Sequence, residues 1–336
     1  MAELKFSILM PVYNGAQYIA ETLRSILSQS FGNYEMIIVD DNSGDATGEV
    51  VASFKDNRIA LYRNRANLGY PGNLNECHRR ASGDIIYLMG QDDILGKDAL
   101  ENTRRAFLLS DDIGAVTRPY FWFDKSVAVP VRAKKQLDPC RDQVVRISDG
   151  STRVIRVFET LDQLSGLALR RSFMDIPFHK DIFPCHVYPF AGIFKKHPVV
   201  FLKDYTVAVR IRSSQCRMVS SIYDTSPVQS WVDLFETVFP GSEFEALRNR
   251  MIRDFVAINY VGLVQIRNYA RYAHVWREIR LLLKYRRRNY FNVLFWFFSI
   301  GCLSMPPCLL IPLVDWYKNT LNSQRFLNIK FNYSFE

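Results

Sequence analysis

The sequence lacks the cysteine and leader patterns of zinc-binding, disulfide-rich or exported proteins. Its six cysteines lie far apart, at positions 77, 140, 185, 216, 302 and 308, and none forms a C-x-x-C pair. Zinc sites need clustered ligands, and disulfide frameworks belong to short secreted chains. No charged and then apolar leader precedes the strand-like residues that begin at Phe6. We therefore expect free thiols and residence in the cytoplasm.

Several functional signatures are also missing. The turn PVYNGAQ after the first expected strand holds one glycine, whereas a dinucleotide-binding turn needs G-x-G-x-x-G. There is no RNP, zinc-finger or helix-turn-helix pattern, no internal repeat and no low-complexity tract. These absences argue against a dinucleotide-dependent dehydrogenase and against a nucleic-acid-binding protein.

The positive charge is concentrated in one stretch. Residues 242–290 hold eleven Arg or Lys and four acidic residues, and so supply +7 of the formal net charge of +9. Basic stretches of this kind attract nucleic acid or anionic lipid headgroups. The next segment, residues 291–314, has twenty-four residues without a charge and is rich in aromatics. This continuation favours a membrane over nucleic acid as the partner.

Residues 291–314 could meet a membrane in different ways. A straight helix of about 20 residues crosses a hydrocarbon layer of about 30 Å, and the basic flank would then be cytoplasmic. Pro306 and Pro307 near the middle disfavour a straight helix. A re-entrant hairpin in the cytoplasmic leaflet, a single span and a buried helix pair all stay open, and we favour the hairpin.

The N-terminal third alternates between strand and helix patterns. Strand-like runs cover residues 6–10, 34–39, 59–62 and 84–89, and helical patterns cover 16–30, 46–54 and 72–81. Strands that alternate with helices at this spacing predict an α/β fold with a parallel, doubly wound sheet. In such sheets the ligand binds beyond the carboxyl ends of the strands.

Polar clusters follow three of these strands: PVYN, DDNSGD and GQDD. Pro11, Val12 and Tyr13 can form a wall for a nucleotide base. Asp40 and Asp41 can accept hydrogen bonds from the base or the ribose, although one of them could instead cap the next helix.

The third cluster contains the candidate metal ligands. Asp92 and Asp93 follow the apolar run 85–89 directly. Mg²⁺ or Mn²⁺ binds through one or two carboxylates together with phosphate oxygens, as the departure of a nucleoside diphosphate requires. Capping of the next helix is the alternative role for this pair.

Four motifs, taken together, carry a family resemblance. FSILMPVYNG, IIVDDNSGD, NLGYPGNLN and ASGDIIYLMGQDD follow one another over residues 6–100. In this order and spacing they resemble the family 2 glycosyltransferases of the GT-A fold, such as bacterial O-antigen and capsule transferases. LSGLALRRS at 164–172 is similar to the acceptor-side loop of the family, and the likeness fades beyond about residue 215.

The resemblance implies a Rossmann-like, mostly parallel GT-A domain that binds a nucleotide-sugar and a divalent metal, Mn²⁺ or Mg²⁺. The D-x-D motif of the family reads Gly90-Gln91-Asp92 here, so its first acid is missing and metal binding should be weaker. Asp92 matches the metal position, and Gln91 could bind the ribose. The expected nucleotide-sugar contacts are Pro11, Val12, Tyr13, Asp40, Asp41, Asn67, Gly69, Gln91 and Asp93.

Inversion at the sugar by direct displacement needs a general base for the acceptor hydroxyl. The family usually supplies an acid from an E-D pair, and His186-Val187 falls near that position in this chain. Histidine titrates near neutrality, so His186 is our first candidate and Asp181 the second, with Asp175 behind them. A structural role for His186 is the alternative.

The resemblance therefore implies an inverting transferase that moves a single sugar to a lipid-linked glycan at the cytoplasmic face of the membrane. Processive synthases look similar but carry several spanning helices and a Q-x-x-R-W motif, whereas this chain has only Gln229-Ser-Trp231. A degenerate GT-A subunit that acts as a scaffold is the non-enzyme alternative. We expect a GT-A domain at 1–215, with nucleotide and acceptor halves at 1–110 and 111–215, and a region at 216–336 that is helical to its end.

Overall fold

In the computed structural model, which describes residues 4–213, 217 and 219–333, the chain divides into two units. The described residues of the first unit are 4–180, 185–210 and 326–333, and all others belong to the second. The predicted boundary between residues 215 and 216 lies outside the described residues, so the predicted domain division stays a prediction.

Within the described residues, the first unit contains an eight-stranded sheet. In spatial order its strands are β3 (Ile59–Arg63), β2 (Tyr34–Asp40), β1 (Phe6–Val12), β4 (Ile85–Leu88), β10 (Ala168–Arg170), β6 (Ala115–Thr117), β11 (Val199–Phe201) and β9 (Gln143–Val145). The first four strands are parallel, which confirms the alternating strand and helix pattern. Because β10 is antiparallel to both β4 and β6, the sheet as a whole is mixed.

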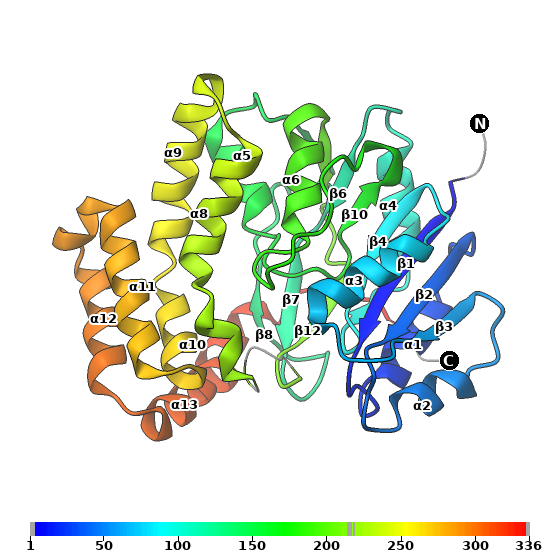
Figure 1. Cartoon of the computed structure of the whole chain (residues 1–336), viewed down its shortest axis with the longest axis horizontal. Helices are drawn as coiled ribbons and strands as arrows, with labels where there is room; N and C mark the ends of the chain where they lie inside the picture. The colour runs from blue at the N-terminus through cyan, green and yellow to red at the C-terminus, as the bar shows by residue number, and fades with distance from the viewer. Residues whose placement is uncertain (1–3, 214–216, 218, 334–336) are drawn as a thin grey trace. The chain divides into compact units, whose positions relative to one another are not determined.

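Helices cover both faces of the parallel strands, and strands buried on both sides are apolar throughout. Ile8 and Met10 of β1 pack in one cluster with Ile19 and Leu23 of α1 (Ile19–Leu27). On the sheet, α3 (Gly69–Arg80) lies across β1 and β2 (Figure 1). The remaining helices of this unit are α2 (Thr47–Ser53), α4 (Ala99–Phe107), α5 (Ser151–Phe158) and α6 (Val187–Lys196).

A smaller sheet extends the first unit, and the C-terminal residues pack on it. Its strands, in order, are β5 (Ile94–Leu95), β12 (Val207–Arg210), β7 (Tyr120–Phe123) and β8 (Pro130–Ala133). The ring of Phe331 meets that of Phe121 edge-on with centroids 5.0 Å apart, and the Lys97 amide donates to the Asn332 carbonyl at 2.8 Å. The expectation of helix to the chain end is therefore wrong for these residues, because the tail pairs with a strand region instead.

The second unit is helical. Its helices are α8 (Pro227–Val238), α9 (Glu245–Asp254), α10 (Val261–Tyr269), α11 (Tyr272–Tyr285), α12 (Val293–Ser304) and α13 (Pro307–Trp316). Ser226 caps α8 by accepting from the Gln229 amide at 3.1 Å. Ser226 also donates at 2.8 Å to the fully buried carboxylate of Glu278, which ties α8 to α11.

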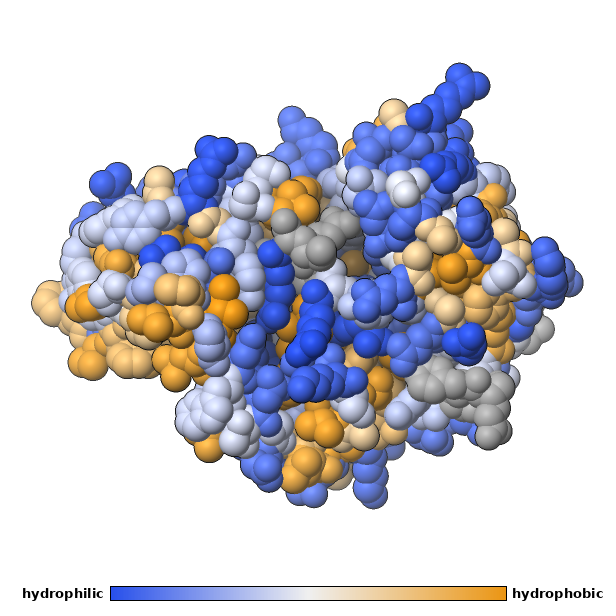
Figure 2. Space-filling model, turned by 90° about the horizontal axis from the view of Figure 1, so that it is seen from below, coloured by the Kyte–Doolittle hydropathy of each residue, from blue (hydrophilic) through white to orange (hydrophobic). Residues whose placement is uncertain are grey.

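The apolar segment 291–314 forms the broken pair α12 and α13. Met305 and Pro306 separate the two helices, as a proline at that point dictates. Among the described residues, no helix combines the length and the apolarity that crossing a bilayer requires. Many of the apolar side chains are exposed: Phe291 by 91% and Phe297 by 70%. Figure 2 shows apolar side chains gathered on this helical unit, at the left of the view.

Candidate active site

Three polar loops meet at one edge of the large sheet because they follow neighbouring parallel strands. Val12 at the end of β1 lies beside Asp40 at the end of β2, and the Asp41 amide donates to the Val12 carbonyl at 2.8 Å. On the other side of β1, the Met89 amide donates to the Leu9 carbonyl at 3.0 Å. The clusters PVYN, DDNSGD and GQDD are thus side by side, as their positions after the strands predict.

Gln91 binds the first of these loops rather than facing away from it. Its side-chain oxygen accepts from the Tyr13 amide at 2.8 Å, and its side-chain nitrogen donates to the Tyr13 carbonyl at 3.0 Å. The adjacent Asn14 has a positive φ of 48° and is held by Ser43, whose hydroxyl accepts from the Asn14 amide at 2.9 Å. The Tyr13 ring, 37% exposed, is left at the rim, where a base could stack on it.

The two acids after β2 divide their roles. Asp40 is buried, accepts from the amide of Ser43 at 2.9 Å and forms an ion pair with Arg63 at 3.2 Å, so it closes its own turn. Asp41 is also buried and accepts from the Asn64 side chain and the Leu68 amide, both at 2.8 Å. Asp41 therefore fixes the loop that leads to α3.

Asn64 and Asn73 belong to this arrangement and were not among the predicted residues. The Asn64 side chain donates to both Asp41 and Asn73, and Asn73 donates to the Val39 carbonyl at 2.9 Å. Asn73 is buried within the motif NLGYPGNLN, so the motif itself was the available signal. Predicted Asn67 is exposed and accepts from the amide of Gly69, which begins α3 with a φ of 72°.

Asp93 of the third loop binds residues that lie much further along the chain. Its carboxylate accepts from the Ser165 hydroxyl, from the Gln163 side chain at 3.2 Å and from the Arg210 amide at 3.0 Å. Burial and the neighbouring charge of Asp92 raise the pKa of Asp93 to about 8. These bonds link the loop after β4 to residues 163–165 and to the end of β12.

Asp92 lies between these two anchored neighbours. It is half-buried, and its carbonyl accepts from the Arg210 side chain at 3.1 Å. A side chain at Gly90 would begin 3.1 Å from both an Asp93 carboxylate oxygen and the Ser165 hydroxyl, so the position of the missing first acid is closely packed. Among the described residues, no three His, Cys, Asp or Glu side chains cluster as a metal site. The donor set fits a cation that one carboxylate and a diphosphate hold together.

A buried arginine anchors the loop at 160–165, and sequence patterns did not reveal it. Arg118 is fully buried and donates to the carbonyls of Thr160 at 3.1 Å, Gln163 at 2.9 Å and Ser165 at 2.7 Å. The loop is therefore fixed both by Arg118 and by its bonds to Asp93.

His186 is buried at the start of α6, and both ring nitrogens have partners. One nitrogen is 2.8 Å from the Leu161 carbonyl, and the other is 3.4 Å from the Tyr70 hydroxyl. Burial lowers the pKa of His186 to about 4. A neutral, enclosed ring of this kind suits the structural alternative that the sequence left open. Asp181, the second candidate, belongs to the other unit and is half-buried.

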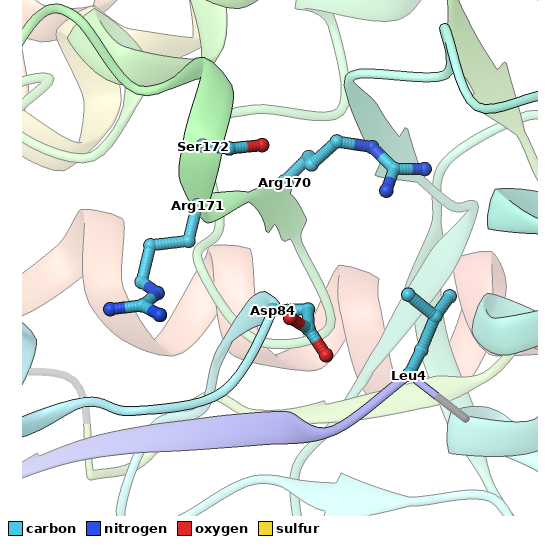
Figure 3. A pocket seen from close by; sticks show the side chains of 5 residues that line it. All are labelled: Leu4, Asp84, Arg170, Arg171 and Ser172. Atoms are coloured by element: carbon cyan, nitrogen blue, oxygen red, sulfur yellow. The ribbon is translucent and has the colours of Figure 1, made fainter. Parts of the chain in front are cut away.

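A separate hollow lies at the opposite edge of the sheet, where β1 and β4 begin (Figure 3). Leu4, Asp84, Arg170, Arg171 and Ser172 line it. The Asp84 carboxylate accepts from the Lys5 amide at 3.0 Å, and Arg171 donates to the Ser82 carbonyl at 3.0 Å. Because ligands of such sheets bind at the carboxyl ends of the strands, this hollow is not the expected nucleotide site.

Comparison with known proteins relates the part of the chain that carries these loops to a known family. Residues 7–158 match the family described as "Glycosyl transferase family 2". A relative from Escherichia coli, "UDP-Glc:alpha-D-GlcNAc-diphosphoundecaprenol beta-1,3-glucosyltransferase WfgD", is 37% identical over 101 residues, which are 30% of this chain and 40% of the relative. The matched stretch spans about two fifths of the length of such curated relatives.

Solved structures share the fold over nearly the whole chain. Staphylococcus aureus TarS 1–349 in complex with UDP-GlcNAc aligns with a TM-score of 0.63 at 15% identity, over 99% of this chain and 97% of TarS 1–349. The mannosyltransferase PcManGT from Pyrobaculum calidifontis, in complex with GDP-Man and Mn²⁺, aligns at 0.55 and 14% identity, over 98% and 84%. At these identities the likeness shows a mixed α/β, GT-A-like fold.

Proposed function

The chain belongs to the family 2 glycosyltransferases through residues 7–158, and on this premise we propose that it transfers a single sugar from a nucleotide diphosphate-sugar to a glycan. In this proposal the transfer serves cell-surface polysaccharide synthesis, which the diphosphoundecaprenol-linked acceptor in the name of the WfgD relative supports. The observation that carries this proposal is the meeting of three strand-end loops, in which Gln91 binds Tyr13 and the Asp41 amide donates to the Val12 carbonyl. Tyr13 and Asp92 are both partly exposed there.

The nucleotide lies against the loops after β1 and β2 in this proposal. Tyr13 offers an exposed ring for stacking, while Pro11 and Val12 form the wall behind it. Asn67 and Gly69 lie in the loop that Asp41 keeps in place through the Leu68 amide, and we expect them to contact the nucleotide too. UDP is the first donor base to test because TarS is described with UDP-GlcNAc, and GDP is the second because PcManGT is described with GDP-Man.

Asp92 is the residue that would hold a divalent metal, Mn²⁺ or Mg²⁺. When bound, the cation neutralises the diphosphate that leaves with the bonding electrons of the sugar. Asp93 is already bonded to Ser165 and to the Arg210 amide, and no acid stands at Gly90. Asp92 is therefore the carboxylate that this loop offers to a cation, and we expect the diphosphate to supply most of the remaining ligands.

Calorimetric titration with UDP and GDP, each with and without Mn²⁺, tests this assignment. We expect Mn²⁺ to tighten binding of one nucleotide by at least about tenfold in the wild type and not in Asp92→Ala. Asp111→Ala, on an exposed loop, is the matched control and should keep the full effect. Absence of binding by either nucleotide would contradict the transferase function, whereas an unchanged Asp92→Ala would contradict only the metal assignment.

The acceptor is lipid-linked and reached at the cytoplasmic face of the membrane in this proposal. Two features support it: the exposed apolar residues of the pair α12 and α13, and the exposed Arg287 and Arg288 just before them. A helix that is apolar on its exposed face and has basic neighbours binds in the plane of an anionic bilayer. The WfgD relative is named for a diphosphoundecaprenol-linked acceptor, which fits such placement.

Sedimentation with liposomes of mixed neutral and anionic lipid tests the membrane step. We expect the double variant Phe291→Ser, Phe297→Ser to lose most of the bound fraction. Both rings are exposed, so replacing them should change the stability of the fold little. Leu61→Ser, at an exposed apolar residue of β3 in the other unit, is the control. Equal binding by all three proteins would exclude the α12–α13 pair as the docking element.

The catalytic base completes the proposed reaction. His186 and Asp181, the bases predicted from the sequence, stay predictions. The low pKa and enclosed ring of His186 favour a role in holding the Leu161 carbonyl over a role as proton acceptor.

A further inference from the structure

The loop at 160–165 occupies the same sheet edge as the candidate donor site. The Gly166 amide donates to the Leu88 carbonyl at 2.8 Å, and the Leu88 amide donates to the Leu167 carbonyl at 2.9 Å. The loop is thereby placed at the carboxyl end of β4, beside the residues Gly90–Asp93. Gln163 and Ser165 then bond to Asp93 directly.

Asp162 stands in this loop with an accessible and oriented carboxylate. It accepts hydrogen bonds from the Tyr120 hydroxyl and, at 2.8 Å, from the ammonium group of Lys134. Its side chain is 39% exposed, whereas Asp40, Asp41 and Asp93 are all buried. Two partners fix the side chain on one flank, and the exposed part can meet a substrate hydroxyl.

On the premise of the proposed function, we infer that Asp162 is the general base that receives the proton of the acceptor hydroxyl. The acceptor oxygen forms its bond to the anomeric carbon while the bond from that carbon to the diphosphate oxygen breaks. The electron pair of the broken bond leaves with the nucleoside diphosphate. The hydroxyl proton passes to Asp162 and then to solvent, so the step inverts the anomeric centre and needs no further reactant.

The charged surroundings of Asp162 keep it ready for this role. Partial burial would raise its pKa, but the charge and hydrogen bond of Lys134, the hydrogen bond of Tyr120 and the charge of Arg132 together lower the pKa below its ordinary value. The buried guanidinium of Arg118 also acts on Asp162 through its charge. The carboxylate is therefore ionised at neutral pH.

Arg118 and His186 act as positioning residues for this base. Arg118 holds the carbonyls on both sides of Asp162 in the loop, and His186 holds the adjacent Leu161 carbonyl. A base must lie within hydrogen-bond reach of the proton that it takes, so a fixed loop is as necessary as an ionised carboxylate.

The first test is the variant Asp162→Asn, compared with Asp138→Asn, which changes a hydrogen-bonded acid of the same half. We expect transfer by Asp162→Asn to fall at least about 100-fold, the usual effect of losing a general base, with UDP or GDP affinity and melting temperature unchanged. Asp138→Asn should transfer at the wild-type rate. Wild-type transfer rates in Asp162→Asn would overturn the inference and leave the proposed function intact.

A second variant makes the test specific for a proton acceptor. Lys134→Met removes a positive charge that lowers the pKa of Asp162, so the acid limb of the pH–rate profile should move to higher pH. An unmoved acid limb, with activity retained, would overturn the role of Asp162. If wild type and all variants bind nucleotide but none transfers a sugar to any acceptor, the proposed function itself fails and this inference fails with it.

Discussion

The side chain of Gln91 provides a quantitative test of how the donor site is organised. Its amide makes two hydrogen bonds to the backbone of Tyr13, at 2.8 and 3.0 Å. Each bond of this kind contributes about 1 kcal/mol net, so Gln91→Ala should loosen the loop by about 2 kcal/mol. Because the ligand must then order that loop, we expect UDP to bind up to about 30-fold more weakly.

The reason for the loss can be identified with modified ligands. In the structure Gln91 binds the backbone of Tyr13, so it would affect the nucleotide indirectly. The sequence suggested instead that Gln91 contacts the ribose directly. Under the first mechanism, Gln91→Ala weakens UDP, 2′-deoxy-UDP and 3′-deoxy-UDP by the same factor in calorimetric titrations. Under the second, the deoxy ligand that lacks the contacted hydroxyl shows little further loss.

A conservative change sharpens the comparison. Gln91→Glu can still accept from the Tyr13 amide but cannot donate to the Tyr13 carbonyl, so it should fall between wild type and Gln91→Ala. The melting temperature of each variant controls for general unfolding. A loss in Gln91→Ala that disappears for one deoxy ligand, or an unchanged affinity for UDP, would refute the indirect mechanism.

Three further predictions concern stability. His186 has a pKa of about 4 in the folded chain against an ordinary value of about 6.5, so its contribution is complete above pH 6.5 and is lost as pH falls towards 4. The free energy of unfolding should change by up to about 3 kcal/mol over this pH range. The melting temperature of His186→Gln should therefore depend less on pH than that of the wild type. Gly90→Asp, which restores the family acid, should lower the melting temperature and leave Mn²⁺ affinity no stronger, because its side chain would crowd Asp93. Phe331→Ala should cost about 2 kcal/mol in chemical unfolding, because its half-buried ring packs against Phe121; an unchanged midpoint would show that the tail is not part of the fold.

The strands around the donor site were predictable because local pattern and tertiary role agree there. The run 34–39 is apolar throughout and is bounded by polar turns, and it forms β2 (Tyr34–Asp40) inside the parallel sheet. The acids that follow it fall where parallel strands place their ligand-facing loops. The strands beyond β4 are only two to four residues long, so alternation of apolar residues marks them weakly.

Two of the side-chain roles that escaped prediction depend on backbone partners. Arg118 lies in the apolar run GAVTRPYFWF and reads as a solvated side chain, yet it is fully buried on three carbonyls that are 42 to 47 residues away. The Gln91 side chain, which the sequence predicted as a ribose contact, likewise binds the backbone of Tyr13. Every residue carries a carbonyl and an amide, so such a partner leaves no trace in the sequence. The C-terminal tail escaped for a related reason, since the Lys97 amide pairs with the backbone of Asn332.

The hydrogen bond between Ser165 and Asp93 explains why the metal motif lacks its first acid at Gly90. Asp93 and Ser165 fill the space beside Gly90, so the side chain of a further acid would not fit at this junction of two loops. That junction continues through the loop at 160–165 to Arg118, which holds three of its carbonyls. A change at Arg118 should therefore disturb Asp93 and Asp162 together, and residues in one network lose additivity. In the proposed reaction, Asp93 beside the donor and Asp162 beside the acceptor therefore belong to one hydrogen-bonded unit.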